Sequence, residues 1–360
     1  MSIQRKNAYF AAANTALGFK SFFDEIFAHG GIERRYVIKG GPGTGKSSFM
    51  RRAALAAQRE GREVEYYYCS SDTDSLDGIV IDGSLAILDG TAPHTCDATL
   101  PGVRDGIIDL GQFWDENRLQ KDADSIILLN GQKAHAYSRA YSFLAAAGKV
   151  ADAQKIAVGD CLLREKMQRA ARKTVAKLAI PVGSGRWRIR QVSAFGSRGG
   201  VRLDTLQDIS RRTLFIRDYY GAAPVFLSLV ADIAIEQGID VDVSVDLLRP
   251  DKADEIYFPA TGDRIALCDD SDVEREGAVN TKRFVDAARI SEIRCAHRTA
   301  KKAQQRLVDL ALDSLSDAGR AHAKIEQYYV AAMDFERQTR YCEQFIERVV
   351  LTRDKKCDII

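Results

Sequence analysis

A glycine-rich stretch near residue 40 constrains this 360-residue chain more than any other feature. Residues 40–47 match the pattern G-x-x-x-x-G-K-[ST], after a β-prone run at 36–38 and before a strong helix former at 48–60. Strand, glycine loop and helix in this order are the setting in which the pattern binds phosphate. A chance match on a glycine-rich turn is the alternative, and the correct flanks disfavour it. The stretch therefore predicts a phosphate loop in an α/β fold.

Each part of this loop has an expected task. Glycines let consecutive backbone N–H groups curl around phosphate oxygens, and the helix N-terminus adds unpaired donors and positive potential. Lys46 is expected to reach the β- and γ-phosphates of ATP, and the Ser47 hydroxyl to bind Mg²⁺. The predicted nucleotide-binding residues are Gly40, Gly41, Pro42, Gly43, Thr44, Gly45, Lys46, Ser47 and Ser48.

An acidic residue is also expected beside this loop. The apolar run 84–89 ends at Asp89, after an intervening strand at 63–69. In P-loop proteins an aspartate at such a strand end holds Mg²⁺, although a turn at Asp89 and Gly90 would also explain the pattern. Gly90 stands where some P-loop hydrolases keep a water-activating glutamate. We therefore expect slow hydrolysis or another base.

Candidates for that base lie in the segment 69–77. Asp72 follows Lys46 by 26 residues, at a strand end where recombinase-type ATPases and several P-loop kinases place a carboxylate. It is predicted to orient water or an acceptor hydroxyl. Capping of a short helix at 75–79 explains Asp72 equally well and explains Asp74 better.

The residues after Asp89 extend the candidate site. Thr91 and His94 lie where a sensor of the γ-phosphate would stand, although ordinary loop roles explain them slightly better. The predicted catalytic residues are Lys46, Asp72 and Asp89, and the predicted metal ligands are Ser47 and Asp89.

The chain also repeats itself. At an offset of 177, residues 34–64 align without a gap with residues 211–241. Each half reads as a small α/β unit followed by helices. We expect an α/β fold of two tandem P-loop NTPase-like repeats with mainly parallel sheets, each with an appended helical arm, in domains 1–180 and 186–360.

The second copy has lost the phosphate chemistry. In the alignment Ala223 replaces the loop lysine and Pro224 the loop serine, and with a small insertion further on Asp269 meets Asp89. A proline is acceptable in the first turn of a helix, but it brings neither a hydroxyl nor a backbone donor. The second repeat is therefore predicted to be degenerate, a pseudo-NTPase.

A basic run crosses the boundary between the halves. Residues 164–190 hold nine basic residues and one acid, with Trp187 among them. Basic residues beside an aromatic can bind nucleic acid, but a solvated helix face explains the same run. With 52 Lys and Arg against 50 Asp and Glu, nucleic acid is not the favoured partner.

Seven cysteines form no C-x-x-C pair, and no apolar run reaches the length of a signal peptide or a membrane span. We therefore expect a cytoplasmic protein without membrane contact.

The motifs together resemble a known family. The segments GGPGTGKSS, CSSDTDSLDG and LAILDGTAPH, with the repeat near 177 residues, resemble a bacterial family of tandem P-loop ATPase-like proteins. The resemblance implies ATP binding at residues 40–48 and adds weight to Asp72, Asp89 and His94. The second half of that family often keeps a glycine-rich loop, and this chain departs from the family there.

These observations predict an ATP-binding P-loop protein. We expect a Mg²⁺-dependent ATPase that uses its nucleotide state to drive a conformational change. One alternative is a P-loop kinase that moves the γ-phosphoryl group to a small molecule or nucleotide, and another is a nucleotide-gated binding module. Beyond the nucleotide, the partner would be an unidentified protein or a small-molecule acceptor.

Overall fold

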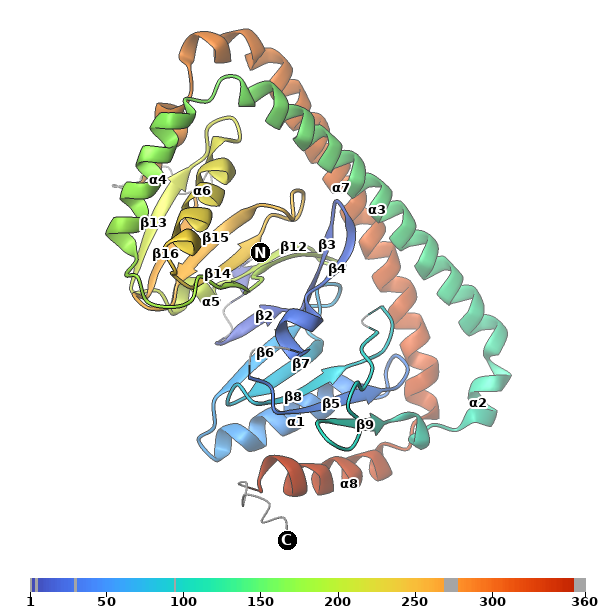
Figure 1. Cartoon of the computed structure of the whole chain (residues 1–360). Coiled ribbons are helices and arrows are strands. Elements are labelled where there is room, and N and C mark those ends of the chain that lie inside the picture. Colours follow the sequence, from blue (N-terminus) through green and yellow to red (C-terminus); the bar gives the residue numbers. More distant parts are fainter. Residues whose placement is uncertain (1, 4–5, 29–30, 94, 269–277, 353–360) are drawn as a thin grey trace. The chain divides into compact units, whose positions relative to one another are not determined.

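The computed structural model describes residues 2–3, 6–28, 31–93, 95–268 and 278–352, and it has a mixed α/β fold (Figure 1). The chain divides into two compact units. Unit 1 comprises Met1–Lys6, Ala13–Lys20 and Arg139–Ser314; unit 2 comprises Asn7–Ala12, Ser21–Ser138 and Leu315–Ile360. Residues 181–185, which separate the two expected domains, lie inside unit 1, so each unit combines segments from both halves of the sequence.

Unit 2 is built on a six-stranded, mainly parallel sheet with the order β2-β6-β7-β8-β5-β9. Only β7 runs antiparallel to its neighbours. The helix α1 (Lys46–Arg59) packs on this sheet through an apolar face that includes Phe49 and Met50. The strands are β2 (Ala8–Phe10), β5 (Arg34–Lys39), β6 (Val64–Tyr68), β7 (Leu76–Ile81), β8 (Leu85–Asp89) and β9 (Asp105–Asp109).

One local prediction is wrong. The short helix expected at 75–79 is instead part of β7, whose six residues are all buried. A run that ends in Ile79, Val80 and Ile81 is β-branched, and burial on both faces favours a central strand. Packing between β6 and β8 therefore overrides the helix-capping potential of the aspartates before it.

Unit 1 contains a second six-stranded sheet, with the order β10-β14-β15-β16-β13-β17. Its order and strand directions repeat those of the first sheet, with β15 as the antiparallel strand. The expectation of an α/β fold with mainly parallel sheets is thereby confirmed. The strands are β10 (Trp187–Ile189), β13 (Arg212–Arg217), β14 (Val241–Val245), β15 (Ala253–Phe258), β16 (Asp263–Leu267) and β17 (Val279–Asn280).

Smaller elements complete the chain. The strands β1 (Ser2–Ile3), β12 (Gly199–Leu203) and β11 (Ser193–Gly196) form a three-stranded sheet, and β3 (Ala12–Thr15) pairs with β4 (Gly18–Ser21). The short helices are η1 (Asp24–Ala28), η2 (Gly111–Phe113), α5 (Thr205–Asp208) and η4 (Thr281–Phe284). In the described part of the chain, no helix has both the length and the apolar character needed to cross a membrane.

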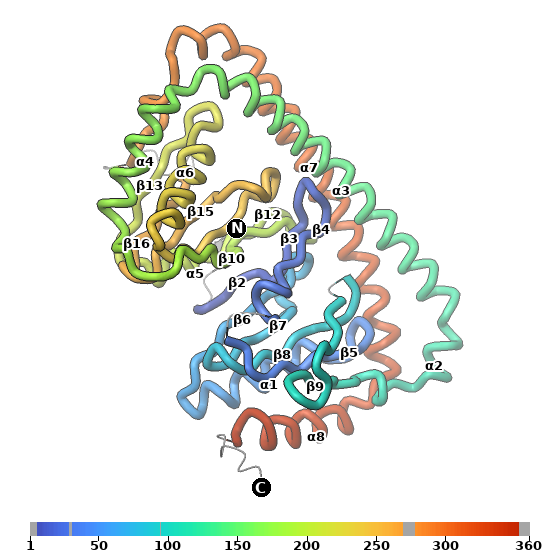
Figure 2. Tube along the Cα trace, viewed as in Figure 1, coloured from blue at the N-terminus to red at the C-terminus, as the bar shows by residue number. Residues whose placement is uncertain are grey.

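The helical arms are exchanged between the units. The first arm, α2 (Glu116–Lys121), α3 (Ala123–Gly159) and α4 (Arg164–Leu178), ends with α4 packed on α6 (Ala222–Glu236) in unit 1. The second arm, α7 (Ala287–Ala332), α8 (Phe335–Phe345) and η5 (Ile346–Val350), ends with α8 packed on α1 in unit 2 (Figure 2). The division between the units falls within α3 and within α7. Each sheet is thus completed by helices that follow the other sheet in the sequence.

A buried ion pair joins the edge strand β9 of the unit 2 sheet to its neighbour β5. The Arg35 guanidinium donates to both Asp105 oxygens, from Nε at 3.1 Å and Nη2 at 2.9 Å, and both side chains are almost fully buried. Burial alone would raise the pKa of Asp105. Hydrogen bonds from Arg35, Arg104 and the N–H groups of Leu100 and Thr99 instead hold that pKa well below its usual range.

Asp105→Asn should lower the free energy of unfolding of unit 2 by about 3 to 5 kcal/mol, because it leaves the buried Arg35 charge without its partner. A low native pKa means that this stabilisation is present at neutral pH and is lost as the pH falls below about 4. Urea unfolding at several pH values measures both effects. Asp97→Asn, at an exposed ion pair with Lys39, is the control and should leave the transition unchanged.

Candidate functional site

Residues 40–45 connect β5 to α1 and fold back on themselves. The buried Thr44 hydroxyl donates to the Gly41 carbonyl at 2.9 Å, which closes the loop. Gly43 and Gly45 have φ values of +69° and +83°, in the left-handed region where side chains are strained. The glycines expected from the motif are therefore required by the backbone shape, and this shape turns the loop toward the first turn of α1.

Lys46, the first residue of α1, curls back over the loop. Its ammonium group donates to the carbonyls of Gly40 at 2.9 Å and Gly41 at 2.8 Å, and it lies 3.6 Å from the Oδ2 atom of Asp89. The Lys46 and Asp89 side chains are mostly buried, at 13% and 14% exposure. The structure thus brings together a cation and a carboxylate that the sequence separates by 43 positions.

Asp89 reaches this place through the sheet register. In the parallel pair β5–β8, Ile38 lies opposite Asp89, so both strands end at the same edge of the sheet. The Oδ1 atom of Asp89 accepts hydrogen bonds from the backbone N–H of Thr91 at 2.9 Å and from its hydroxyl at 2.5 Å. Thr91 therefore orients Asp89. His94, the other residue suggested after Asp89, lies outside the described residues.

Packing forbids a side chain at position 90. The Gly90 N–H donates to the Ile38 carbonyl at 2.9 Å. A Cβ atom built on Gly90 would lie 2.2 Å from Cγ1 of Val37 and 2.8 Å from the Cys96 carbonyl oxygen. The absence of a glutamate after Asp89 thus has a steric cause.

Ser47 is held by a strand neighbour. Its hydroxyl oxygen accepts a hydrogen bond from the Leu76 N–H at 3.0 Å, which fastens the first turn of α1 to the start of β7. Among the described residues, no group of three or more His, Cys, Asp and Glu side chains could hold a metal ion. Serine and aspartate oxygens suit Mg²⁺, which is commonly bound by one or two carboxylates together with substrate phosphates.

Asp72 lies in the turn between β6 and β7. One of its carboxylate oxygens accepts from the Asp74 N–H at 3.3 Å, and its carbonyl accepts from the Ser75 N–H at 2.9 Å. The Ser47–Leu76 hydrogen bond brings the end of this turn next to α1. Asp72 therefore stabilises this turn, and the helix that it would cap in the alternative interpretation is absent because residues 76–81 form β7.

The far end of α7 covers the loop, which no sequence pattern indicated. A Cβ atom on Gly41 would lie 2.5 Å from the Tyr329 ring. A Cβ atom on Gly43 would lie 2.9 Å from both the Glu326 carbonyl oxygen and Cγ2 of Val330. Gly41 and Gly43 therefore lack side chains where a helix packs directly on them. These contacts join residues nearly 290 positions apart, so local motifs could not reveal them.

The helix α8 completes this cover. Gln338, a buried polar residue, places its amide nitrogen 3.5 Å from a Cβ atom built on Gly45. Two backbone hydrogen bonds of 2.8 Å hold the α7–α8 junction, Asp115 N–H to Ala332 O and Asp334 N–H to Phe113 O. The ends of α7 and α8 are therefore an integral part of unit 2.

The loop of unit 1 is shorter than the gapless alignment suggested. Residues 218–220 join β13 to the glycine before α6, whereas residues 40–44 make the same connection in unit 2, so the loop has lost two residues. Gly221 (φ +80°) is the structural counterpart of Gly45. Ala222 therefore corresponds to Lys46, which shifts the expected match with Ala223 by one position.

The strand position of Asp89, the predicted metal ligand, is not acidic in unit 1. The β13–β16 register places Leu267 opposite Ile216, as Asp89 stands opposite Ile38. Leu267 is therefore the counterpart of Asp89 in the strand register, while Asp269, the predicted match, lies outside the described residues. A shift in the strands compensates a deletion in the loop, so an alignment without gaps cannot detect either change.

A carboxylate of unit 1 occupies the start of α6. Asp218 accepts the Gly221 N–H at 2.9 Å through Oδ2 and the Ala223 N–H at 2.8 Å through Oδ1. Helix N-termini attract anions through such unpaired N–H groups. The chain's own carboxylate therefore fills the position that a phosphate would take.

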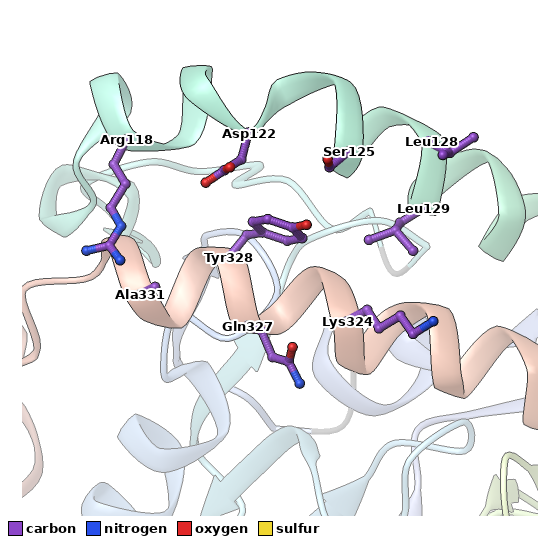
Figure 3. Close-up of a pocket in the computed structure, with 9 residues that line it drawn as sticks. All are labelled: Arg118, Asp122, Ser125, Leu128, Leu129, Lys324, Gln327, Tyr328 and Ala331. Carbon is purple, nitrogen blue, oxygen red and sulfur yellow. The ribbon is translucent and has the colours of Figure 1, made fainter.

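A groove lies on the other side of α7 (Figure 3). It has a volume of about 670 Å³ and runs between α2–α3 and α7, with Tyr328 projecting between the helices and Arg118, Asp122 and Lys324 among its polar residues. No phosphate-loop residue lines it. The groove is therefore separate from the Lys46–Asp89 site.

Comparisons of this chain with protein-family models, with curated proteins and with solved structures found no match. The resemblance to tandem P-loop ATPase-like proteins accordingly stays a prediction from the motifs.

Asp218→Ala should destabilise unit 1 by about 1 kcal/mol, because the first N–H groups of α6 lose their acceptor. Thermal unfolding followed by circular dichroism measures the change. Asp232→Ala, on the exposed side of the same helix, is the control and should be neutral or slightly stabilising, since alanine is the better helix former. Equal stabilities for the parent and the Asp218 variant would contradict the capping role.

Proposed function

We propose that this chain is a P-loop nucleotide-binding protein that binds one Mg-ATP at residues 40–48. The observation that carries the proposal is the convergence of Lys46 and Asp89, 3.6 Å apart, on a glycine loop that leads into a helix N-terminus. Among the described residues, none accepts a hydrogen bond from the backbone N–H groups of residues 44–48. Such donors, with a lysine beside them, suit a triphosphate.

Mg²⁺ fits the same site. The Ser47 hydroxyl would bind the ion directly, and Asp89, oriented by Thr91, would hold it through its second oxygen. Bound Mg²⁺ would neutralise charge on the phosphates. Within the chain, Lys46 would leave the Gly40 and Gly41 carbonyls for the phosphates, and the loop would keep the triphosphate in position.

We propose slow hydrolysis as the activity. The packing around Gly90 leaves no room for a water-activating glutamate, and Asp72 is the candidate for orienting the attacking water. Phosphoryl transfer depends mainly on positioning and charge, so a site without a strong base can still transfer the group to a well-placed hydroxyl. The same steric observation therefore favours a kinase as the second candidate.

Unit 1 would then be a degenerate P-loop repeat without nucleotide. Its sheet repeats the strand order of unit 2, which supports a common origin of the two folds. Its shortened loop, the alanines at the start of α6 and the Asp218 cap support the loss of phosphate binding. A structural or regulatory role for unit 1 follows from this proposal.

Lys46→Ala should weaken ATP binding by at least about 100-fold, because hydrogen bonds to charged groups contribute about 1.5 to 3 kcal/mol each and the lysine is expected to make two or more. Calorimetry should give one ATP per parent chain. Arg59→Ala, which removes an exposed cation at the other end of α1, is the control and should bind like the parent. Two ATP sites per chain, or unchanged binding by Lys46→Ala, would refute the assignment.

The fate of the γ-phosphate separates the candidate activities. Without an arginine finger we expect hydrolysis on the order of 10⁻⁴ to 10⁻³ s⁻¹. The protein is incubated with γ-labelled ATP, with and without a metabolite pool, and the label is followed. Label only in inorganic phosphate supports the ATPase, whereas label on a metabolite supports the kinase.

Asp72→Asn should slow either reaction, while Asp74→Asn in the same turn serves as the matched control. Rapid hydrolysis by the parent that persists in Asp72→Asn would contradict both the slow turnover and the role of Asp72.

A further inference from the structure

The basic residues of the chain are concentrated in one of its two units. Unit 1 holds 32 Lys and Arg against 24 Asp and Glu, whereas unit 2 holds 20 against 26. The formal net charge of +2 for the whole chain therefore conceals one cationic unit and one anionic unit. A cationic unit attracts polyanions, which the charge balance of the whole chain did not favour as partners.

The structure divides the basic run of the sequence into two parts. In the second part, Arg188 donates to both oxygens of Asp242, from Nε at 2.7 Å and from Nη2 at 2.8 Å. Arg186 forms an ion pair with Asp240 at 3.2 Å. These arginines are therefore paired with acids of unit 1, and the cations available to a partner lie in the first part of the run, on α4.

The helix α4 presents its cations on the face opposite the core. Its apolar stripe is buried in the core that contains α6, and consists of Met167, Ala171, Val175 and Leu178. Its six basic residues are all exposed: Arg164, Lys166, Arg169, Arg172, Lys173 and Lys177. Within α4, which the structure describes in full, the only acid is Glu165, paired with Arg169 at 3.5 Å. The exposed face is thus a cationic strip, about 20 Å long at 1.5 Å per residue.

This cationic strip does not stabilise the helix that carries it. Arg169, Lys173 and Lys177 follow one another at a spacing of four residues, at which like charges destabilise a helix. Arg164 and Lys166 lie in the first turn, where the helix dipole disfavours positive charge. In unit 2 the helix that packs on α1, α8, carries two basic residues and two acids. The packing position therefore does not require a cationic helix, whereas a bound polyanion would explain one.

We propose that the cationic strip of α4 binds the phosphate backbone of a nucleic-acid duplex. The inference concerns unit 1 and does not depend on the proposed nucleotide site. Double-stranded DNA carries one charge per about 1.7 Å of its axis, so several phosphates fall within the length of the strip. Contacts to phosphates carry no sequence information, and binding is therefore independent of base sequence.

Two features of α4 favour a duplex over other polyanions. The helix contains no aromatic residue on which the bases of a single strand would stack. Its apolar stripe is buried in the core of unit 1, so it is not available to enter a lipid surface as the apolar face of an interfacial helix does. A rigid row of cations without stacking groups suits a regular double-stranded backbone.

The test titrates the full chain into a labelled DNA duplex at several salt concentrations. The variant Arg169→Gln/Lys173→Gln/Lys177→Gln removes one row of the strip. It should bind at least about tenfold more weakly than the parent, and the slope of log K against log salt should decrease in magnitude by about 3, since each lost phosphate contact removes about 1.

The matched control removes three exposed cations from unit 2, in the variant Arg59→Gln/Lys121→Gln/Arg340→Gln. It lowers the net charge of the chain by the same amount and should bind the duplex like the parent. Equal losses in the two variants would trace binding to net charge alone and would overturn the role of α4.

Thermal unfolding distinguishes a binding role of the strip from a structural one. The α4 variant relieves repulsion between like charges, so its unfolding temperature should equal that of the parent or be slightly higher. A lower unfolding temperature would show that the cations stabilise unit 1 and would overturn the inference.

The remaining outcomes concern the partner. Parent-like binding by the α4 variant, or no binding of the duplex by the parent at low salt, would overturn the proposal. Tighter binding of single-stranded DNA or of phosphatidylserine vesicles than of the duplex would overturn it as well, and would identify a different partner for the cationic strip.

Discussion

The unpaired N–H groups at the start of a helix favour a nearby negative charge. In each six-stranded sheet of this protein, one strand leads through a short loop into such a helix, β5 into α1 and β13 into α6. In unit 1 the charge is Asp218, which belongs to the same short loop and caps α6. In unit 2 the loop is two residues longer, contains Lys46 and is covered by α7. The difference between the capped loop of unit 1 and the longer loop of unit 2 therefore rests on two residues of loop length and on the Asp218 carboxylate.

Because the helical arms are exchanged, the loop of unit 2 is covered by a helix that begins in unit 1. The helix α7 follows the second sheet in the sequence, and its residues belong to unit 1 up to Ser314 and to unit 2 from Leu315 onward. Its end, together with α8, packs on the phosphate loop and on α1. A ligand that moves this end would act on a helix shared by both units. Under the proposed function, the nucleotide state of one repeat would thus be transmitted through the arm of the other.

Local patterns were sufficient to predict much of this arrangement. The β5–loop–α1 sequence and the strand ending at Asp89 follow from short-range preferences and a motif, and the parallel register then brings Asp89 to Lys46. The strand β7 was not predicted, because its conformation depends on burial between the neighbouring strands β6 and β8. The deletion in the second loop was hidden by a compensating shift in the strands.

The cover of the loop could not be predicted in the same way. Glu326 and Gln338 occupy ordinary positions on amphipathic helices, and only the tertiary structure brings them to the loop. The steric role of Gly90 likewise depends on Val37 and Cys96, which approach it from other segments. The sequence thus identified the charged and polar residues of the candidate site, whereas tertiary packing determines which of them are in contact.

The most direct test is a crystal structure of the full chain with Mg²⁺ and a non-hydrolysable ATP analogue. The account predicts phosphate oxygens on the N–H groups of residues 43–48 and Mg²⁺ between Ser47 and Asp89. It also predicts no nucleotide at Asp218. An analogue bound outside residues 40–48 would contradict it.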